Sequence, residues 1–337
     1  MERIMFNKII KPILGALAIA VFFTGCTTSS KPGKNGWYVD YDAAKKEAQK
    51  KNKNLLIFFS VVDNDAESWT LKEKVFDTKE FVSALSKRFI LVNLDFSASL
   101  SGDDEDQSEK GKKEAEERQR KIEYMGYIAS LYNVDSIPSV FLATKEGYCA
   151  AKIEASDEDA APEVYIKLIE SKTADLDKIN TLADAVRAAS GVEKVRAIDA
   201  LSEATDDTRR LLLADLFRTL PSLDPNDETG LVGKYLLLTA VFDASTFYAR
   251  RDFSSAIQAL VSAAEDNRLG GRERQHAYYY AGELLTTTGS TDYKAVFDYF
   301  QKAYDADPES EYAPRIAKML VALKEEIERT SGDGKQQ

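Results

Sequence analysis

The sequence predicts an α/β domain over residues 36–173, with a central mixed sheet flanked by helices, followed by an all-α domain over residues 176–330. Two observations support this division. In the first half, short apolar runs rich in branched and aromatic residues alternate with helical patterns, as expected of strands that are buried on both faces. After residue 176 no strand-like run remains, and polar or glycine-containing breaks separate the helical segments.

Residues 1–25 have the pattern of an export signal. Basic residues precede an apolar stretch at 12–23, which is too short to span a bilayer. The stretch ends in Phe23-Thr24-Gly25-Cys26, which resembles the lipobox of bacterial lipoproteins, with Phe23 in place of the usual Leu. The resemblance implies a cell-envelope protein that is anchored by lipid (palmitate) on Cys26. Thr27, where an Asp would resemble an inner-membrane retention signal, favours the outer membrane and its periplasmic face. An ordinary secretory signal is the alternative.

Charge limits the partners. The net charge of the whole chain is −11, and it becomes −13 without residues 1–25, which carry one acidic and three basic residues. A chain this acidic is repelled by nucleic acid and by anionic lipid headgroups. We therefore expect no nucleic-acid partner, and a membrane contact only through the lipid anchor.

Cysteine use limits the chemistry. The chain contains two cysteines, Cys26 and Cys149. If Cys26 is acylated, Cys149 has no partner for an internal disulfide, although export permits disulfide formation. Thiol–disulfide exchange within one chain needs an attacking and a resolving thiol. The sequence therefore excludes the two-cysteine mechanism.

Strands and helices alternate after a polar linker at 26–35. Asp42 and Thr78 are suitable N-caps, and Pro162 suits the first turn of a helix. The expected strands are 37–39, 55–59, 89–95, 140–144 and 148–153. The expected helices are 43–49, one through 69–75, one after Thr78, one over 122–132 and one from Pro162. The charged run at 103–120 is expected to be a solvated loop and helix start, with a partner-docking tail as the alternative.

Two stretches resemble the thioredoxin-like family. The order of strand, loop and helix over 54–76 resembles its active-site turn, but Asp65 and Ser68 occupy the two cysteine positions of its C-x-x-C motif. Ile137-Pro138, at the start of a strand, resembles the cis-proline that packs beside that turn; a trans proline opening a strand is the alternative. The resemblance covers residues 37–172.

The resemblance implies that this chain has the thioredoxin-like fold but cannot carry out the disulfide exchange of that family. In the family, the turn and the cis-proline strand form a groove that holds an extended peptide through main-chain contacts. The matching residues for such a groove are Trp69, Ile137 and Pro138, beside the degenerate positions Asp65 and Ser68. Trp69 is either an exposed anchor or a core residue.

The all-α part contains an internal repeat. Asp252-Phe253-Ser254-Ser255-Ala256, followed by Leu260 and Ala263, recurs forty residues later at 292–303. The spacing resembles the second helix of a tetratricopeptide repeat, in which small residues let the paired helix approach. A generic helical bundle is the alternative. A final amphipathic helix is expected at 312–329 and a disordered tail at 331–337.

Few residues offer chemistry. Asp63, Asp65 and Glu67 could act as acids or bases, but a polar loop is expected to keep them solvated. Cys149 lies on an expected strand, which supplies no cation or helix N-terminus to activate it, so a buried inert thiol is favoured over a reactive one. His276 is the only histidine, which excludes a histidine metal site. We expect no catalytic constellation, metal or cofactor.

These observations lead to three hypotheses. The favoured one is a membrane-anchored, redox-inactive thioredoxin-like lipoprotein that acts as a binding or scaffold module for a protein or peptide in the envelope. The first alternative is an enzyme, either a thiol-dependent oxidoreductase that uses Cys149 alone or a carboxylate-based activity at Asp63, Asp65 and Glu67. The second alternative is purely architectural: the thioredoxin-like domain is a spacer, and only the helical part binds.

Overall fold

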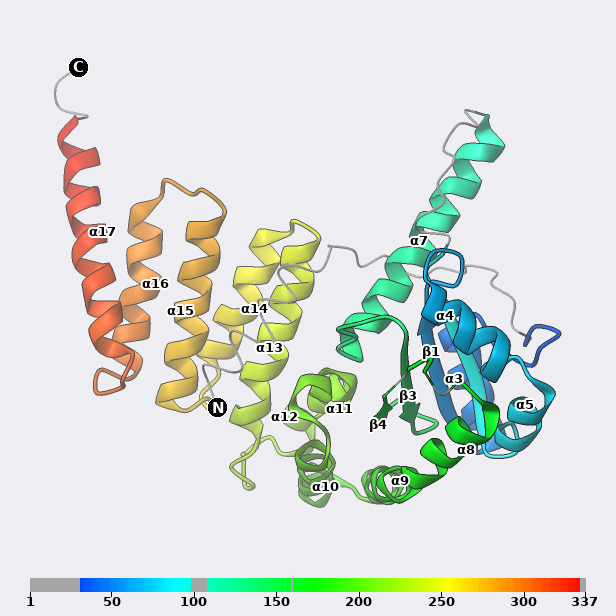
Figure 1. Cartoon of the computed structure of the whole chain (residues 1–337). Helices are drawn as coiled ribbons and strands as arrows, with labels where there is room; N and C mark the ends of the chain where they lie inside the picture. Colours follow the sequence, from blue (N-terminus) through cyan, green and yellow to red (C-terminus); the bar gives the residue numbers. More distant parts are fainter. Residues whose placement is uncertain (1–30, 98–107, 155, 159, 334–337) are drawn as a thin grey trace. The chain divides into compact units, whose positions relative to one another are not determined.

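The computed structural model describes residues 31–97, 108–154, 156–158 and 160–333. Within these ranges the chain forms two compact units, one of residues 31–189 and 197–213 and the other of residues 190–196 and 214–333. We refer to them as the α/β unit and the helical unit (Figure 1). The expected signal segment, the acylation site Cys26 and residues 26–30 of the expected linker lie outside the described residues.

A four-stranded mixed sheet forms the centre of the α/β unit. The spatial order is β2-β1-β3-β4, with β1 parallel to β2 and the other pairs antiparallel. The strands are β1 (Asn54–Ser60), β2 (Phe89–Asp95), β3 (Ser139–Ala143) and β4 (Cys149–Ile153).

The expected first strand, at 37–39, is a single bridge. Tyr38 pairs with Val92 in the parallel sense, beside the outer edge of β2. The chain cannot continue as a strand there, because Asp40 already caps helix α3 (Tyr41–Lys51) by accepting a hydrogen bond from Ala43 N at 2.7 Å. The expected cap, Asp42, lies inside the first turn instead. The prediction of five full strands was therefore wrong by one.

Helices cover both faces of the sheet. One face packs against α3, α7 (Glu109–Leu131) and Leu212 of the 3-10 segment η3 (Asp207–Leu213). The first half of α7 is largely exposed and extends beyond the sheet (Figure 1). It is held by pairs one turn apart, such as Arg120 with Glu116. The expected solvated start of a long helix is confirmed for residues 108–120.

The other face of the sheet is covered by four helical elements, which begin with the helix that follows β1. The covering helices are α4 (Ala66–Leu71), the π-helical turn η2 (Lys72–Phe76), α5 (Lys79–Leu85) and α8 (Pro162–Ser171). Thr78 caps α5 as predicted, by accepting from Phe81 N at 3.3 Å. Leu176 of α9 (Thr173–Ala188) belongs to the same core, so the α/β unit extends beyond the expected boundary at residue 173.

The helical unit is built of consecutive helices that pack side by side. Residues 207–223 form the 3-10 segment η3 and two four-residue helices, α11 and α12. The expectation of a disordered tail was wrong for residues 331–333, since α17 continues to Asp333; residues 334–337 lie outside the described residues. The helices of this unit are part of α10 (Gly191–Ala204), α11 (Ala214–Phe217), α12 (Leu220–Leu223), α13 (Val232–Ala249), α14 (Phe253–Glu265), α15 (Gly271–Thr287), α16 (Tyr293–Ala306) and α17 (Ala313–Asp333).

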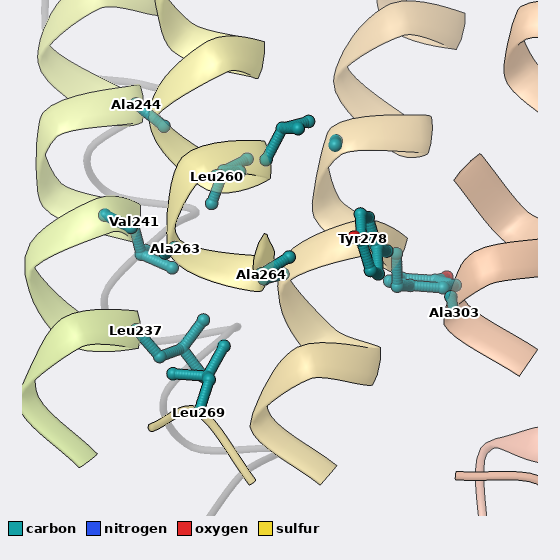
Figure 2. Close-up of a cluster of buried hydrophobic side chains, with 14 of the residues drawn as sticks. Leu237, Val241, Ala244, Leu260, Ala263, Ala264, Leu269, Tyr278 and Ala303 are labelled. Carbon is teal, nitrogen blue, oxygen red and sulfur yellow. The ribbon is translucent and has the colours of Figure 1, made fainter. Parts of the chain in front are cut away.

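The predicted repeat occupies equivalent places in α14 and α16. Asp252 and Asp292 cap the two helices in the same way, each accepting from the backbone N–H three residues later. The repeated apolar positions are buried in one continuous core with α13 and α15, part of which Figure 2 shows. Gly282 of α15 permits the close approach, because a Cβ there would lie 3.1 Å from the ring of Phe300. The tetratricopeptide-like assignment itself stays a prediction.

Candidate functional site

Three connections meet at one end of the sheet. Phe59 pairs with Ser139, so one further step of the antiparallel register places Pro138 opposite Ser60. Ile153 pairs with Val140, so the chain after β4 leaves at the same end. We call this the loop end of the sheet: residues 61–68, 133–138, 154 and 156–158. The register thus brings the expected groove positions Asp65 and Ser68 to the same end as Ile137 and Pro138.

The turn before β3 has the predicted backbone. The Ile137–Pro138 bond is cis. Pro138 is buried and Ile137 is half-buried. Ser139 closes the turn by donating its hydroxyl proton to the carbonyl of Ser136 at 2.6 Å.

Asp65 and Ser68 hold the turn that leads into α4. Asp65 is the N-cap, and its carboxylate accepts a hydrogen bond from Ser68 N at 2.6 Å. Ser68 is fully buried, and its hydroxyl oxygen accepts from Val61 N at 3.2 Å. Both side chains therefore bind main-chain N–H groups, and neither can exchange disulfides.

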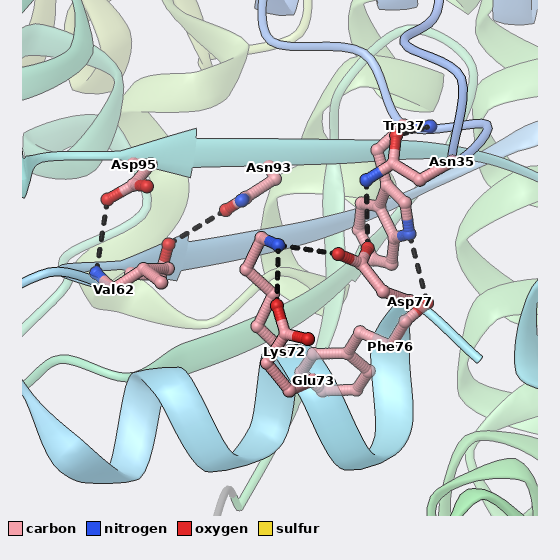
Figure 3. Close-up of polar contacts among 10 residues, drawn as sticks. Asn35, Trp37, Val62, Lys72, Glu73, Phe76, Asp77, Asn93 and Asp95 are labelled. Carbon is pink, nitrogen blue, oxygen red and sulfur yellow. Dashed lines mark hydrogen bonds and ion pairs between the residues drawn. The ribbon is translucent and has the colours of Figure 1, made fainter.

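The preceding loop is fastened to the end of β2. Val62 N donates to Asp95 Oδ1 at 3.2 Å, and Asp63 N donates to Ser97 Oγ at 2.9 Å. Ser97 itself donates its backbone N–H and hydroxyl to the same Asp95 oxygen. Figure 3 shows the Val62 bond beside the one from Ser60 to Asn93. The loop main chain is thus tied down before α4 begins.

The far end of that helical stretch is fastened to the N-terminal segment. Lys72 pairs with Asp77 at 2.5 Å, and Asn35 donates to the other oxygen of the same carboxylate at 2.8 Å (Figure 3). Trp37 donates its indole N–H to the carbonyl of Phe76 at 3.1 Å. These bonds satisfy carbonyl and charged groups around the π-helical turn, so α4 and η2 are held at both ends.

Glu67 is less solvated than the sequence suggested. It is half-buried, and burial raises its pKa above the ordinary value; the carboxylates of Asp157 and Asp65 raise it further, while a backbone N–H of Asp157 opposes them. Asp63, by contrast, is exposed as expected. Within the described ranges, no lysine or arginine forms an ion pair with Glu67. The role of Asp157 was not predicted, because its position depends on the register of β4.

Trp69 is exposed rather than part of the core. Half of its surface, 50%, is accessible. Residues two apart on a helix project from different sides, so Trp69 and Glu67 do not form one patch. The sequence-predicted groove set is therefore only partly brought together: Asp65, Ser68, Ile137 and Pro138 share the loop end, and Trp69 projects from the side of α4 away from Glu67.

Cys149 lies at the opposite end of the sheet. It pairs with Ala143, the last residue of β3, whereas the cis-proline precedes the first. The thiol is 5% exposed, and burial raises its pKa to about 12, a shift that the nearby Arg209 guanidinium opposes. At neutral pH the thiol is protonated and covered. This matches the buried, inert cysteine that the sequence favoured over a reactive one.

The possible metal ligands and the single histidine were located within the described ranges. No group of three or more His, Cys, Asp or Glu side chains there is arranged to hold a metal ion. His276 packs on α15 among aromatic rings, 5.2 Å from that of Tyr312. In the same ranges, no helix has the length and apolar character needed to cross a membrane.

Comparison with known proteins identifies the two parts separately. Residues 36–142 match a family model described as thioredoxin-like, and residues 231–329 match one described as an uncharacterised protein C-terminal domain. A solved structure titled DsbH Oxidoreductase is similar over 45% of this chain and 94% of its own, with 16% sequence identity and a TM-score of 0.31. No curated protein matches the sequence significantly. Residues 36–142 are thus a thioredoxin-like domain, followed by a separate all-helical region.

Proposed function

We propose that this protein is a lipid-anchored binding or scaffold module of the bacterial cell envelope, and that its thioredoxin-like domain holds a protein or peptide without redox chemistry. The observation that carries the proposal is the use of Asp65 and Ser68. At the two positions where the family carries thiols, this chain has a helix cap and a buried hydroxyl, each bound to a main-chain N–H. The fold is retained and the reactive atoms are replaced by supporting ones.

The retained cis-proline turn supports binding rather than a purely architectural role. By the family resemblance, the turn after β1 and the cis-proline strand form a groove that holds an extended segment through main-chain contacts. Ile137 and Pro138 lie at that end, opposite the loop after β1. The partner is a protein or peptide of the envelope, and the anchor is a lipid on Cys26.

The alternative is an oxidoreductase that uses Cys149 alone. Its thiol is buried, has a pKa raised to about 12 and sits at the end of the sheet away from the cis-proline turn. A nucleophilic cysteine needs a lowered pKa and access to its substrate. Neither condition is met, so the binding function is preferred.

Two measurements on the full chain test the proposal. The first is disulfide reduction of insulin by the wild type, by Cys149→Ser and by a variant carrying Asp65→Cys and Ser68→Cys together. We expect activity from the double variant alone, since only it has two thiols at the turn. Activity in the wild type that Cys149→Ser abolishes would establish the alternative.

The second measurement is capture of partners by crosslinking in membranes. A photo-crosslinking residue at Ile137 is expected to capture a defined protein, whereas one at the exposed Glu170 of α8 is not. Fatty-acid analogue labelling of the wild type and of Cys26→Ala tests the anchor in the same cells. Identical capture from both positions, or fatty-acid label that survives Cys26→Ala, would contradict the proposal.

A further inference from the structure

A segment that joins the two units packs across the sheet of the α/β unit. Residues 206–213, which include the 3-10 turn η3, belong to the α/β unit, and the next residue, Ala214, begins the helical unit. Leu212 packs against the core on the α3 and α7 face of the sheet. We call residues 206–213 the strap.

Arg209 is the main polar contact of the strap. Its Nε donates a hydrogen bond to the carbonyl oxygen of Tyr132 at 2.9 Å, and its guanidinium carbon lies 5.3 Å from the centre of the Phe141 ring. The side chain is 15% exposed and is paired with Asp206 at 3.6 Å. A charged donor on a carbonyl, stacked on an aromatic face, is among the stronger polar contacts in proteins.

These contacts bracket the cis-proline turn. Tyr132 is the residue after the end of α7, where helix carbonyls lack intrahelical donors. Phe141 lies in β3, three residues after Pro138. One arginine from the strap therefore fixes the chain on both sides of residues 133–138.

The strap also lies over Cys149. The thiol belongs to the same core cluster against which Leu212 packs. Both Arg209 and Asp206 act electrostatically on it, in opposite directions. The thiol is therefore a built-in reporter of whether the strap is in place.

The remaining arginine of the strap serves a different purpose. Arg210 donates to the carbonyl of Ser202 at 3.1 Å and pairs with Asp207 at 2.9 Å. These partners, together with Glu203 at 3.7 Å, lie within residues 202–207, so Arg210 shapes the strap itself and provides a matched control for Arg209.

We propose that residues 206–213 form a releasable strap on the candidate binding turn: in place, it holds residues 133–138 through Arg209 and covers Cys149, and its release frees both. The proposal rests on the proposed function in so far as residues 133–138 are the binding surface. It adds a device within the α/β unit that regulates that surface.

The test uses the full chain with Cys26→Ala, so that Cys149 is the single thiol. Two quantities are measured under native conditions: the rate at which a maleimide labels Cys149, and the hydrogen exchange of amides at 133–139. In Arg209→Ala we expect both rates to rise about tenfold, which is the effect of losing one charge-assisted hydrogen bond. In Arg210→Ala we expect both to stay at the wild-type values.

Further variants keep the test decisive. If Arg209→Ala does not fold, Arg209→Lys keeps the positive charge but changes the planar donor, and smaller increases in both rates are expected. Leu212→Ala, which loosens the apolar contact, should act in the same direction. Unchanged rates in Arg209→Ala, or equal increases in Arg209→Ala and Arg210→Ala, overturn the strap. No partner is present in either measurement, so this failure is separate from a failure of the capture experiment above.

Discussion

The hydroxyl oxygen of Ser68 accepts a hydrogen bond from the backbone N–H of Val61, 3.2 Å away, across the turn between β1 and α4. By the family resemblance, Ser68 occupies the position of the second thiol in thioredoxin-like domains that have a C-x-x-C motif. Here the same site fastens the end of the strand to the first turn of the helix. The turn is therefore maintained by contacts that a redox-active cysteine pair would not supply.

Removing that hydroxyl should destabilise the α/β unit. In Ser68→Ala the N–H of Val61 loses its partner in a largely buried place, at a cost of about 1–3 kcal/mol in the free energy of unfolding. Both tryptophans, Trp37 and Trp69, lie in this unit, so urea unfolding followed by tryptophan fluorescence reports on it alone. The exposed Ser83→Ala in α5 serves as the control, and equal stability of the two variants would contradict the assignment.

The cap of α4 offers a second prediction. Asp65→Ala leaves the N–H of Ser68 without its acceptor, which should cost about 1 kcal/mol in the free energy of unfolding. Asp65→Asn keeps an acceptor oxygen and should recover most of that loss. Fluorescence-detected urea unfolding of the three proteins measures the difference, and an Asn variant no more stable than the Ala variant would argue against a capping role.

The pKa of Glu67 predicts a pH-dependent stability. In the folded state the pKa of Glu67 lies above its ordinary value, mainly because of burial and then because of the carboxylates of Asp157 and Asp65. The folded state then binds the proton more tightly than the unfolded state, so this group lowers stability as pH rises through its titration range. Glu67→Gln should therefore be more stable than the wild type at pH 7, and the difference should shrink toward pH 3.5. A stability gain of Glu67→Gln that is equally large at pH 7 and pH 3.5 would contradict this interpretation.

The hydroxyl group of Tyr41 leaves no room for a side chain at Gly147. Its φ is +93°, and a Cβ there would collide with the hydroxyl oxygen of Tyr41. That hydroxyl lies 3.0 Å from the hydroxyl of Tyr132, which donates to the carbonyl of Gly147 at 2.8 Å. Gly147→Ala should cost about 2–4 kcal/mol through strain and steric conflict.

A suppressor separates the two causes. Adding Tyr41→Phe to Gly147→Ala removes the atom that clashes and leaves only the positive φ. The double variant should be more stable than Gly147→Ala, although Tyr41→Phe alone is destabilising. Strictly additive losses, measured by fluorescence-detected unfolding, would show that the collision does not occur.

In the helical unit, Phe300 should be the most sensitive of the repeated apolar positions. It is 1% exposed and packs against Gly282, so Phe300→Ala leaves a cavity that costs about 3–5 kcal/mol. This unit contains no tryptophan, and hydrogen exchange of α15 and α16 measures the loss. The exposed Lys294→Ala should leave exchange unchanged, and protection that survives in Phe300→Ala would rule out the stacked core.

The sequence predicted the elements that depend on local pattern. The buried run at 55–59, the cap Thr78, the cis bond before Pro138 and the helices of the repeat at 252–263 and 292–303 were all found. Each follows from neighbouring residues in the chain or, for the cis bond, from the family resemblance. Local sequence patterns and the family resemblance were therefore sufficient to predict most of the central fold.

The misses depend on contacts between distant segments. Leu176 joins the core of the α/β unit and Leu212 packs on its other face, so that unit incorporates residues that helical periodicity alone assigns to the next domain. The approach of Asp157 to Glu67 and that of Arg209 to Tyr132 depend on strand register and chain path. Neither leaves a signal in the local sequence, because any polar residue would fit the pattern there.

The fastening of Val62 and Asp63 to Asp95 and Ser97 has a consequence for association. A loop that is already tied to a neighbouring strand gives up little conformational entropy when another molecule docks beside it. Docking against residues 62 and 63 should therefore leave the backbone of this loop close to its free conformation.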